Sequence, residues 1–137
     1  MKIAKEFKWE MGHRLPFHPG KCKNLHGHTY KMIVELEGDL DSNGMLIDYY
    51  DVHKIIFPII DELDHAFMVY EKDHELIEGL KKLNSNFVVV PYQATAENIC
   101  FYFLEKIKKA GLPKAVHGLK VRIFETETTY AEAEMKV

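Results

Sequence analysis

The chain has 137 residues, 47% hydrophobic and 28% charged, which is typical of one globular domain spanning residues 1–137. Its net charge of −3 argues against a nucleic-acid-binding protein that relies on attraction to phosphates, and no apolar run is long enough to cross a membrane. Its two cysteines, Cys22 and Cys100, are too few for a secreted disulfide framework, so a cytoplasmic location is expected.

The first half of the chain is predicted to form two strands and a helix. Residues 3–11 form the first strand, and residues 14–25, with two prolines and a glycine, form a loop. Residues 28–36 alternate with a period of two, which predicts a half-buried strand. Residues 48–63 have apolar side chains at steps of three and four, which predicts a helix that Pro58 should kink or divide.

The second half is predicted to form another helix and two more strands. Thr95 is a suitable N-cap for a helix that ends at Ala110, before Gly111. Residues 119–124 and 130–137 read as strands, and residues 87–90 as a possible short one. The order predicts an α+β fold, a four-stranded antiparallel sheet with two helices on one face. Because so small a sheet exposes its edges, sheets of several subunits are expected to join in an oligomer.

The strongest chemical signal is His26-Gly27-His28. Side chains two residues apart on a strand point to the same face, and paired imidazoles suit zinc. Two unrelated surface histidines would give the same pattern, and the pair alone does not decide between these readings.

His13 favours the metal reading, because a hairpin closed by the loop 14–25 would bring it near the other two histidines. Three histidine ligands leave the fourth position of zinc open, which is the pattern of a catalytic site. The remaining histidines lack partners at ligand spacing and are expected to be solvated or locally bonded: His18, His53, His74 and His117 among them.

Cys22 lies four residues before His26, and its spacing allows two roles. It could be a fourth ligand of a closed structural zinc site, or a thiolate near the metal that acts as an acid–base group. Cys100 lies on the apolar stripe of the second helix and is expected in the core.

Three acidic positions are weaker candidates. Asp64 and His65 could form a proton relay, although a hydrated helix end is the simpler interpretation. Glu125, at a strand end, could bind a ligand with two parallel N–H donors, or could be a polar residue at a turn. Glu97 fits the first turn of its helix, and that role could be its only one.

Taken together, these features resemble the 6-pyruvoyl-tetrahydropterin synthase family. The matching segments occur in the family's order across nearly the whole chain: FKWEMGHRLP (7–16), CKNLHGHTY (22–30), GMLIDY (44–49), LDH (63–65), TAENI (95–99) and ET (125–126). The upstream histidine, the Cys-x-x-x-His-Gly-His motif and the downstream Asp-His together make a specific pattern.

The resemblance implies a tunnelling fold (T-fold), in which subunit sheets join into a barrel and two trimers form a hexamer. It implies zinc as the cofactor and a role for each matching residue. The zinc ligands would be His13, His26 and His28. Cys22 would transfer protons without binding zinc, and Asp64 with His65 would form a relay that reaches a neighbouring subunit's site. Glu125 would anchor the pterin ring and join the relay, and Thr95 and Glu97 would line the pterin pocket.

The implied substrate is 7,8-dihydroneopterin triphosphate. The three residues between Cys22 and His26, with no glutamate among them, match the branch of the family that makes 6-carboxytetrahydropterin, with loss of triphosphate and acetaldehyde, for queuosine and archaeosine synthesis. The alternatives are a pyruvoyl-type synthase or related pterin lyase, and a non-enzymatic, zinc-stabilised assembly module. Ala94 and Met68-Val69 depart from the usual proline and Leu-Asn, and residues 67–91 are long and charged, which bears on pocket shape and product.

Overall fold

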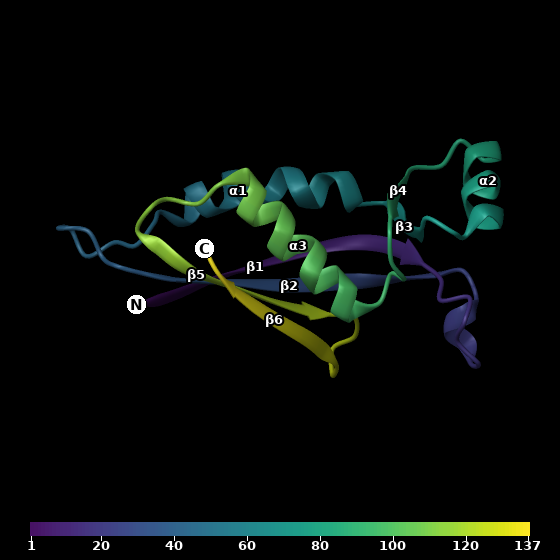
Figure 1. Cartoon of the computed structure of the whole chain (residues 1–137), viewed down its shortest axis with the longest axis horizontal. Helices are drawn as coiled ribbons and strands as arrows, with labels where there is room; N and C mark the ends of the chain where they lie inside the picture. The colour runs from purple at the N-terminus through teal and green to yellow at the C-terminus, as the bar shows by residue number, and fades with distance from the viewer.

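A computed structural model describes all residues, 1–137, and shows one mixed sheet covered on one face by helices (Figure 1). The sheet has six strands in the order β4-β3-β1-β2-β5-β6. The strands are β1 (Lys2–His13), β2 (His26–Gly38), β3 (Ala66–Tyr70), β4 (Phe87–Val90), β5 (Val116–Phe124) and β6 (Tyr130–Lys136). The helices are α1 (Tyr49–Leu63), α2 (His74–Lys82) and α3 (Ala96–Ala110), with a 3-10 turn, η1, at Lys21–Lys23.

The long β1–β2 hairpin forms the centre of the sheet. Its antiparallel register runs from Lys2 opposite Glu37 to His13 opposite His26, and β5 and β6 continue the antiparallel pairing beyond β2. Alternate residues of these strands face α1 and α3, where Trp9 stacks on Tyr30 with ring centroids 5.2 Å apart. The opposite face is charged and carries ion pairs along the strands, such as those of Lys120 with carboxylates of β2 and β6.

The predicted four-stranded antiparallel sheet with two helices is wrong in its count. Two short strands extend the sheet in parallel: β3 pairs with β1 only at Met11 and Gly12, and β4 pairs along β3. Between them α2 packs Leu76 and Leu80 against Val69 in a small separate core. The possible short strand predicted at residues 87–90 is confirmed as β4, whereas β3, with five residues immediately after the turn that ends α1, is too short to show a clear period.

The two long helices confirm their predicted spans to within a residue. Asp48 caps α1, accepting a hydrogen bond from the Tyr50 N–H at 2.7 Å, and Thr95 caps α3. Cys100 is 1% exposed and lies in the core, as predicted. The division of the helix at Pro58, one of the two predicted outcomes, is wrong, because α1 continues through it. Pro58 lies on the solvent side of the helix, where water can satisfy the carbonyl that loses its N–H partner.

The molecule is elongated, and its two ends differ. Both termini lie towards one end in Figure 1, whereas α2 and the loop with η1 lie at the other, where β1 ends and β2 begins. None of its helices combines the length and the apolar character needed to span a membrane.

Candidate metal centre and ligand pocket

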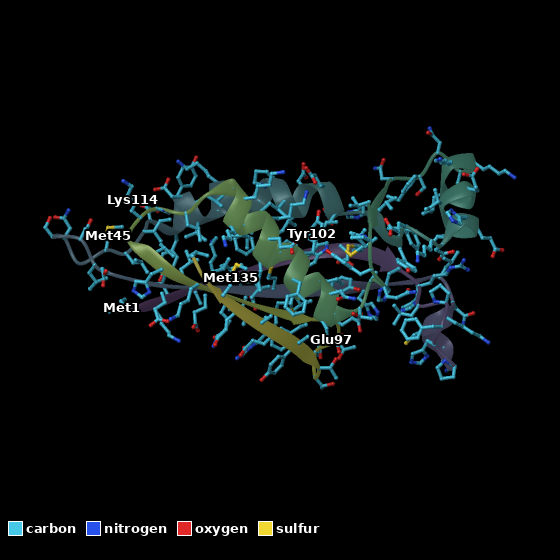
Figure 2. The ribbon with its side chains drawn as sticks, viewed as in Figure 1. Met1, Met45, Glu97, Tyr102, Lys114 and Met135 are labelled. Atoms are coloured by element: carbon cyan, nitrogen blue, oxygen red, sulfur yellow. The ribbon has the colours of Figure 1, made fainter.

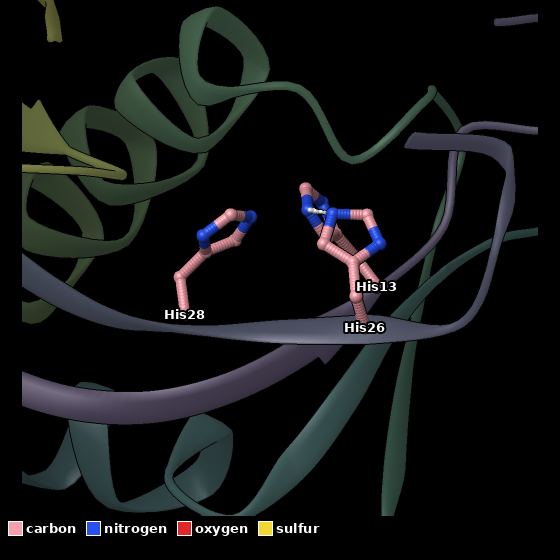
Figure 3. Close-up of side chains that lie close together, drawn as sticks. All are labelled: His13, His26 and His28. Atoms are coloured by element: carbon pink, nitrogen blue, oxygen red, sulfur yellow. Dashed lines mark hydrogen bonds between the residues drawn. The ribbon is translucent and has the colours of Figure 1, made fainter. Parts of the chain in front are cut away.

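The three predicted histidine ligands meet where β1 ends and β2 begins. His13 and His26 are opposite each other in the hairpin register, and His28 follows two residues later on the same face (Figure 3). One ring nitrogen of each lies within 4.8 Å of those of the other two. The ring centroids are 4.6 to 5.2 Å apart. The hairpin therefore places His13 near the other two, as the sequence predicted.

Backbone carbonyls fix the tautomers of two of these histidines. His13 Nδ1 lies 2.7 Å from the Ala94 carbonyl, and His26 Nδ1 lies 2.7 Å from the Asn24 carbonyl. Because a carbonyl only accepts, each Nδ1 carries the proton and each Nε2 is left with a lone pair. The two Nε2 atoms face each other at 3.1 Å, the contact dashed in Figure 3. A bound cation would relieve the repulsion between these lone pairs.

The surroundings add further acceptors. His28 Nε2 is buried and has no hydrogen-bond partner. Oε1 of Glu125 lies 3.5 Å from His13 Nε2 and accepts one hydrogen bond, from the Tyr30 hydroxyl at 3.3 Å. This excess of acceptors, with neutral imidazoles among them, fits a divalent metal such as zinc.

Burial keeps the cluster in the form that can bind a metal. Desolvation lowers the pKa of His13, against the opposing influence of the Ala94 carbonyl and Glu125, and it likewise lowers the pKa of His28. Both rings are therefore neutral near pH 7, with nitrogen lone pairs available. Desolvation together with the charge of Glu125 raises the pKa of Tyr30, which keeps its hydroxyl protonated as a donor to that carboxylate.

A pocket of about 350 Å³ adjoins the cluster through Glu125. Thr95 and Glu97 line it from the first turn of α3, whose start is marked by Glu97 in Figure 2. The loop after β1 forms another wall, with Leu15, Phe17 and His18. The structure thus brings the three predicted pterin-binding residues into one pocket next to the histidines.

Comparison with known proteins identifies the family of this chain. A sequence profile described as 6-pyruvoyl tetrahydropterin synthase matches residues 2–136. The chain belongs to the 6-pyruvoyl tetrahydropterin synthase family. It is 40% identical to the 6-carboxy-5,6,7,8-tetrahydropterin synthase of Haemophilus influenzae, and 33% identical to that of Aquifex aeolicus, in each case over 96% of both chains. It is an enzyme of the lyase class, similar to 6-carboxytetrahydropterin synthase.

Solved structures show the same fold. The 6-pyruvoyl tetrahydropterin synthase of Plasmodium vivax matches with a TM-score of 0.80 at 19% identity, covering 100% of this chain and 98% of that one. An uncharacterised protein from Wolinella succinogenes matches with a TM-score of 0.79 at 26% identity, covering 97% of each chain. The subunit fold expected for this family member is therefore present, as a mixed six-stranded sheet with three helices.

The Asp64–His65 pair lies apart from the pocket that Glu125 lines. Asp64 Oδ1 is 3.0 Å from His65 Nδ1 and also accepts the Glu10 N–H at 2.9 Å. The Glu10 N–H hydrogen bond is the main cause that lowers the pKa of Asp64, with His65 second. His65 lines a different hollow, of about 370 Å³, which includes Glu10 and Thr29 from the charged face of the sheet and also reaches His28.

Cys22 lies in η1 within the loop after β1. Its carbonyl accepts the Leu15 N–H at 2.9 Å, which closes the loop, and its side chain is half-buried. The group of side chains that could hold a metal consists of the three histidines and does not include Cys22. Both cysteines are free thiols.

The sequence did not predict several contacts around the end of β1, next to the histidine cluster. Arg14, next to His13, forms a two-pronged ion pair with Asp73, the N-cap of α2, at 2.7 and 2.6 Å. The Ala94 carbonyl orients His13 across 81 residues of sequence. His18 is locally bonded, as one of its two predicted alternatives had it, and it also lines the pocket, which was not predicted. No local pattern marks these residues, because each contact joins distant segments.

Proposed function

We propose that this family member is a zinc-dependent 6-carboxytetrahydropterin synthase. It converts 7,8-dihydroneopterin triphosphate and water to 6-carboxy-5,6,7,8-tetrahydropterin, acetaldehyde and triphosphate, in the cytoplasmic synthesis of the 7-deazaguanines queuosine and archaeosine. The observation that carries this proposal is the cluster of histidine nitrogens beside Glu125, which opens to a pocket with acceptor side chains. The relatives named for the same activity support it.

In this proposal Nε2 of His13 and Nε2 of His26, together with His28, hold Zn²⁺. The carbonyl-fixed tautomers of His13 and His26 and the lowered pKa values of His13 and His28 support this assignment. When bound, Zn²⁺ supplies Lewis acidity that makes the C–H bonds beside the substrate's side-chain hydroxyls more acidic.

Glu125 binds the pterin ring in this proposal. A carboxylate accepts two parallel N–H donors, which the amino group and ring nitrogen of a pterin present. The Tyr30 hydroxyl orients Glu125 from the core side. Thr95 and Glu97 contribute to the pocket wall, and the hydroxyl of Thr95 is held by the N–H of Asn98 as the helix cap.

Cys22 and the Asp64–His65 pair move protons. The Cys22 thiolate removes a proton from the substrate side chain, and His65, oriented by Asp64, returns protons elsewhere. His65 lies partly on the charged face and its side chain is 76% exposed, which supports service to a neighbouring chain's site. The edge of β1 before Met11 and the outer edge of β6 have no strand partner, which supports assembly into trimers and a hexamer.

The first experiment measures turnover of 7,8-dihydroneopterin triphosphate by zinc-loaded protein under anaerobic conditions, with mass spectrometry of the products. We expect 6-carboxytetrahydropterin and acetaldehyde. A pyruvoyl or other pterin product would retain the site and move the chain to the alternative pterin lyase activity. No turnover, with zinc bound, would favour the zinc-stabilised assembly module.

A variant of Cys22 separates its two possible roles. In Cys22→Ala we expect zinc content to remain near one equivalent and turnover to fall by about 10²–10⁴-fold, because proton transfer is lost while the three histidines remain. Metal analysis and product formation are measured on the same sample. Cys100→Ala is the matched control, since this core thiol should leave both readings unchanged. Loss of a full zinc equivalent in Cys22→Ala would instead make Cys22 a structural ligand.

A further inference from the structure

The loop between β1 and β2 places an unassigned histidine against the proposed substrate. His18 lines the same pocket as Glu97 and Glu125 and is only partly exposed. Its backbone N–H donates to the Leu15 carbonyl at 2.9 Å, in a tight turn at the start of the loop. The side chain therefore belongs to an ordered wall of the pocket.

Gly20 holds the imidazole ring of His18 in position and determines its tautomer. The Gly20 N–H donates to His18 Nδ1 at 2.9 Å. Because a peptide N–H can only donate, Nδ1 carries the lone pair and the neutral ring carries its proton on Nε2. The ring lies close against the backbone, since a Cβ on Gly20 would stand 3.1 Å from its Cε1 and 3.3 Å from its Nδ1. His18 is thus a fixed donor at the pocket wall.

The charges on the two walls differ. Glu97 and Glu125 present carboxylate acceptors on the α3 and β5 side. On the loop side the pocket is lined by Leu15, Phe17 and His18, with no carboxylate, and Lys21 and Lys23 lie further along the same loop, outside the lining. Carboxylates suit the N–H donors of a pterin ring, whereas fixed N–H donors and cations suit phosphate oxygens. A ligand with a pterin at one end and phosphates at the other would match this asymmetry when its phosphates face the loop.

We propose that the Nε2–H of His18 donates a hydrogen bond to an oxygen of the substrate's triphosphate, so that the enzyme prefers the phosphorylated substrate. This inference rests on the proposed function and deepens it by assigning the binding of the leaving group. It gives His18 a substrate-binding role and leaves proton transfer to the residues already named.

The test compares His18→Asn with His18→Gln. Asparagine can place an amide nitrogen near the former Nδ1 but not near Nε2, whereas glutamine can reach the Nε2 position. For zinc-loaded His18→Asn we expect the KM for 7,8-dihydroneopterin triphosphate to rise about tenfold. The inhibition constant of unphosphorylated 7,8-dihydroneopterin should stay unchanged. His18→Gln should recover most of the lost affinity, and Gly20→Ala, which displaces the ring, should show a smaller rise in KM.

His117→Asn is the matched control, because this exposed histidine lies towards the other end of the sheet, in β5. Equal weakening of both compounds in His18→Asn, or no change in either, would overturn the inference. A wild-type protein that binds substrate but makes no pterin product would overturn the proposed function, and His18 would then be judged from equilibrium binding of the same two compounds. In that binding measurement, equal effects of His18→Asn on the two compounds would overturn the assignment of His18 to the triphosphate.

Discussion

The side chain of His13 is 1% exposed and that of His65 is 76% exposed, although each ring has a carboxylate close to it. His13 ends the longest antiparallel pairing of the sheet, and its ring is held by the Ala94 carbonyl, 81 residues away in the sequence. His65 follows α1 in a left-handed backbone conformation, with φ at 58°, and its side-chain partner is its neighbour Asp64. The first site is built by packing within one chain, and the second by a local turn.

This difference separates two kinds of functional geometry. The histidine cluster needs only the hairpin register and two carbonyls, so a single folded chain prepares it for a metal. The Asp64–His65 pair is oriented but left open, so its chemistry depends on what approaches it. Changes to the first site should therefore remove the metal, and changes to the second should spare it.

The largest effect is expected at the cluster. His26→Ala removes one of the three proposed nitrogen ligands, and the buried His13 side chain, which packs in the core, is retained. We expect zinc content to fall from one equivalent to nearly none, and turnover to fall at least about 1000-fold. Metal analysis after native purification and product formation measure the two effects. His117→Ala serves as the control, and full zinc occupancy in His26→Ala would contradict the three-histidine site.

A smaller effect on activity is expected at the open pair. His65→Ala should lower turnover by about 100-fold while zinc remains bound, because only a proton-transfer group is lost. Asp64→Asn should act in the same direction but less strongly, since the imidazole itself remains. Zinc loss in either variant would show that the two regions are not independent.

Mixing the two kinds of variant tests whether the sites are shared between chains. The His26→Ala and His65→Ala proteins are unfolded separately, mixed in equal amounts and refolded together. If each active site takes its metal cluster from one chain and its His65 from another, about a quarter of the sites regain both groups. If both groups come from the same chain, no site is complete and the mixture stays inactive.

The sequence could predict what depends on short-range pattern. Alternation along residues 28–36 and the step of three and four along residues 48–63 predicted the central strand and the first helix, and the pair His26 and His28 followed from the strand period alone. His13 could be assigned to the same site because a hairpin brings the end of the first strand next to the start of the second. These features use neighbours along one or two elements.

The remaining features depend on contacts that pattern does not record. The strand β3 is short and pairs with β1 at only two positions, and the parallel pairing of β4 with β3 is not apparent from the run at residues 87–90 that predicted a strand there. The Ala94 carbonyl that orients His13 has no side-chain signature, and His18 reaches the pocket through a loop turn. Pro58 failed as a signal because an exposed helix face tolerates the missing hydrogen bond.

The smallest expected effect concerns the ion pair that joins the two regions, between Arg14 after His13 and Asp73 in the segment after His65. The side chain of Asp73 is 7% exposed, and the Arg14 guanidinium holds the pKa of this carboxyl below its usual range. Asp73→Asn should lower the free energy of unfolding by about 2 kcal/mol at pH 7. Glu75→Gln is the matched control, because Glu75 lies 3.8 Å from Arg14 with a side chain 93% exposed, and its effect should stay below about 0.5 kcal/mol.

The difference in stability between wild type and Asp73→Asn should depend on pH. A carboxyl whose pKa is lower in the folded state stabilises the fold above its unfolded pKa, near 4, and this contribution is lost as the pH falls through the folded value. Urea unfolding of wild type and Asp73→Asn should therefore converge below about pH 4. At pH 7 the variant should keep its zinc, because the carbonyls that orient His13 and His26 do not depend on Asp73. If Asp73→Asn released zinc as completely as His26→Ala, the cluster would depend on the segment after His65, and the contrast between a self-contained site and an open one would fail.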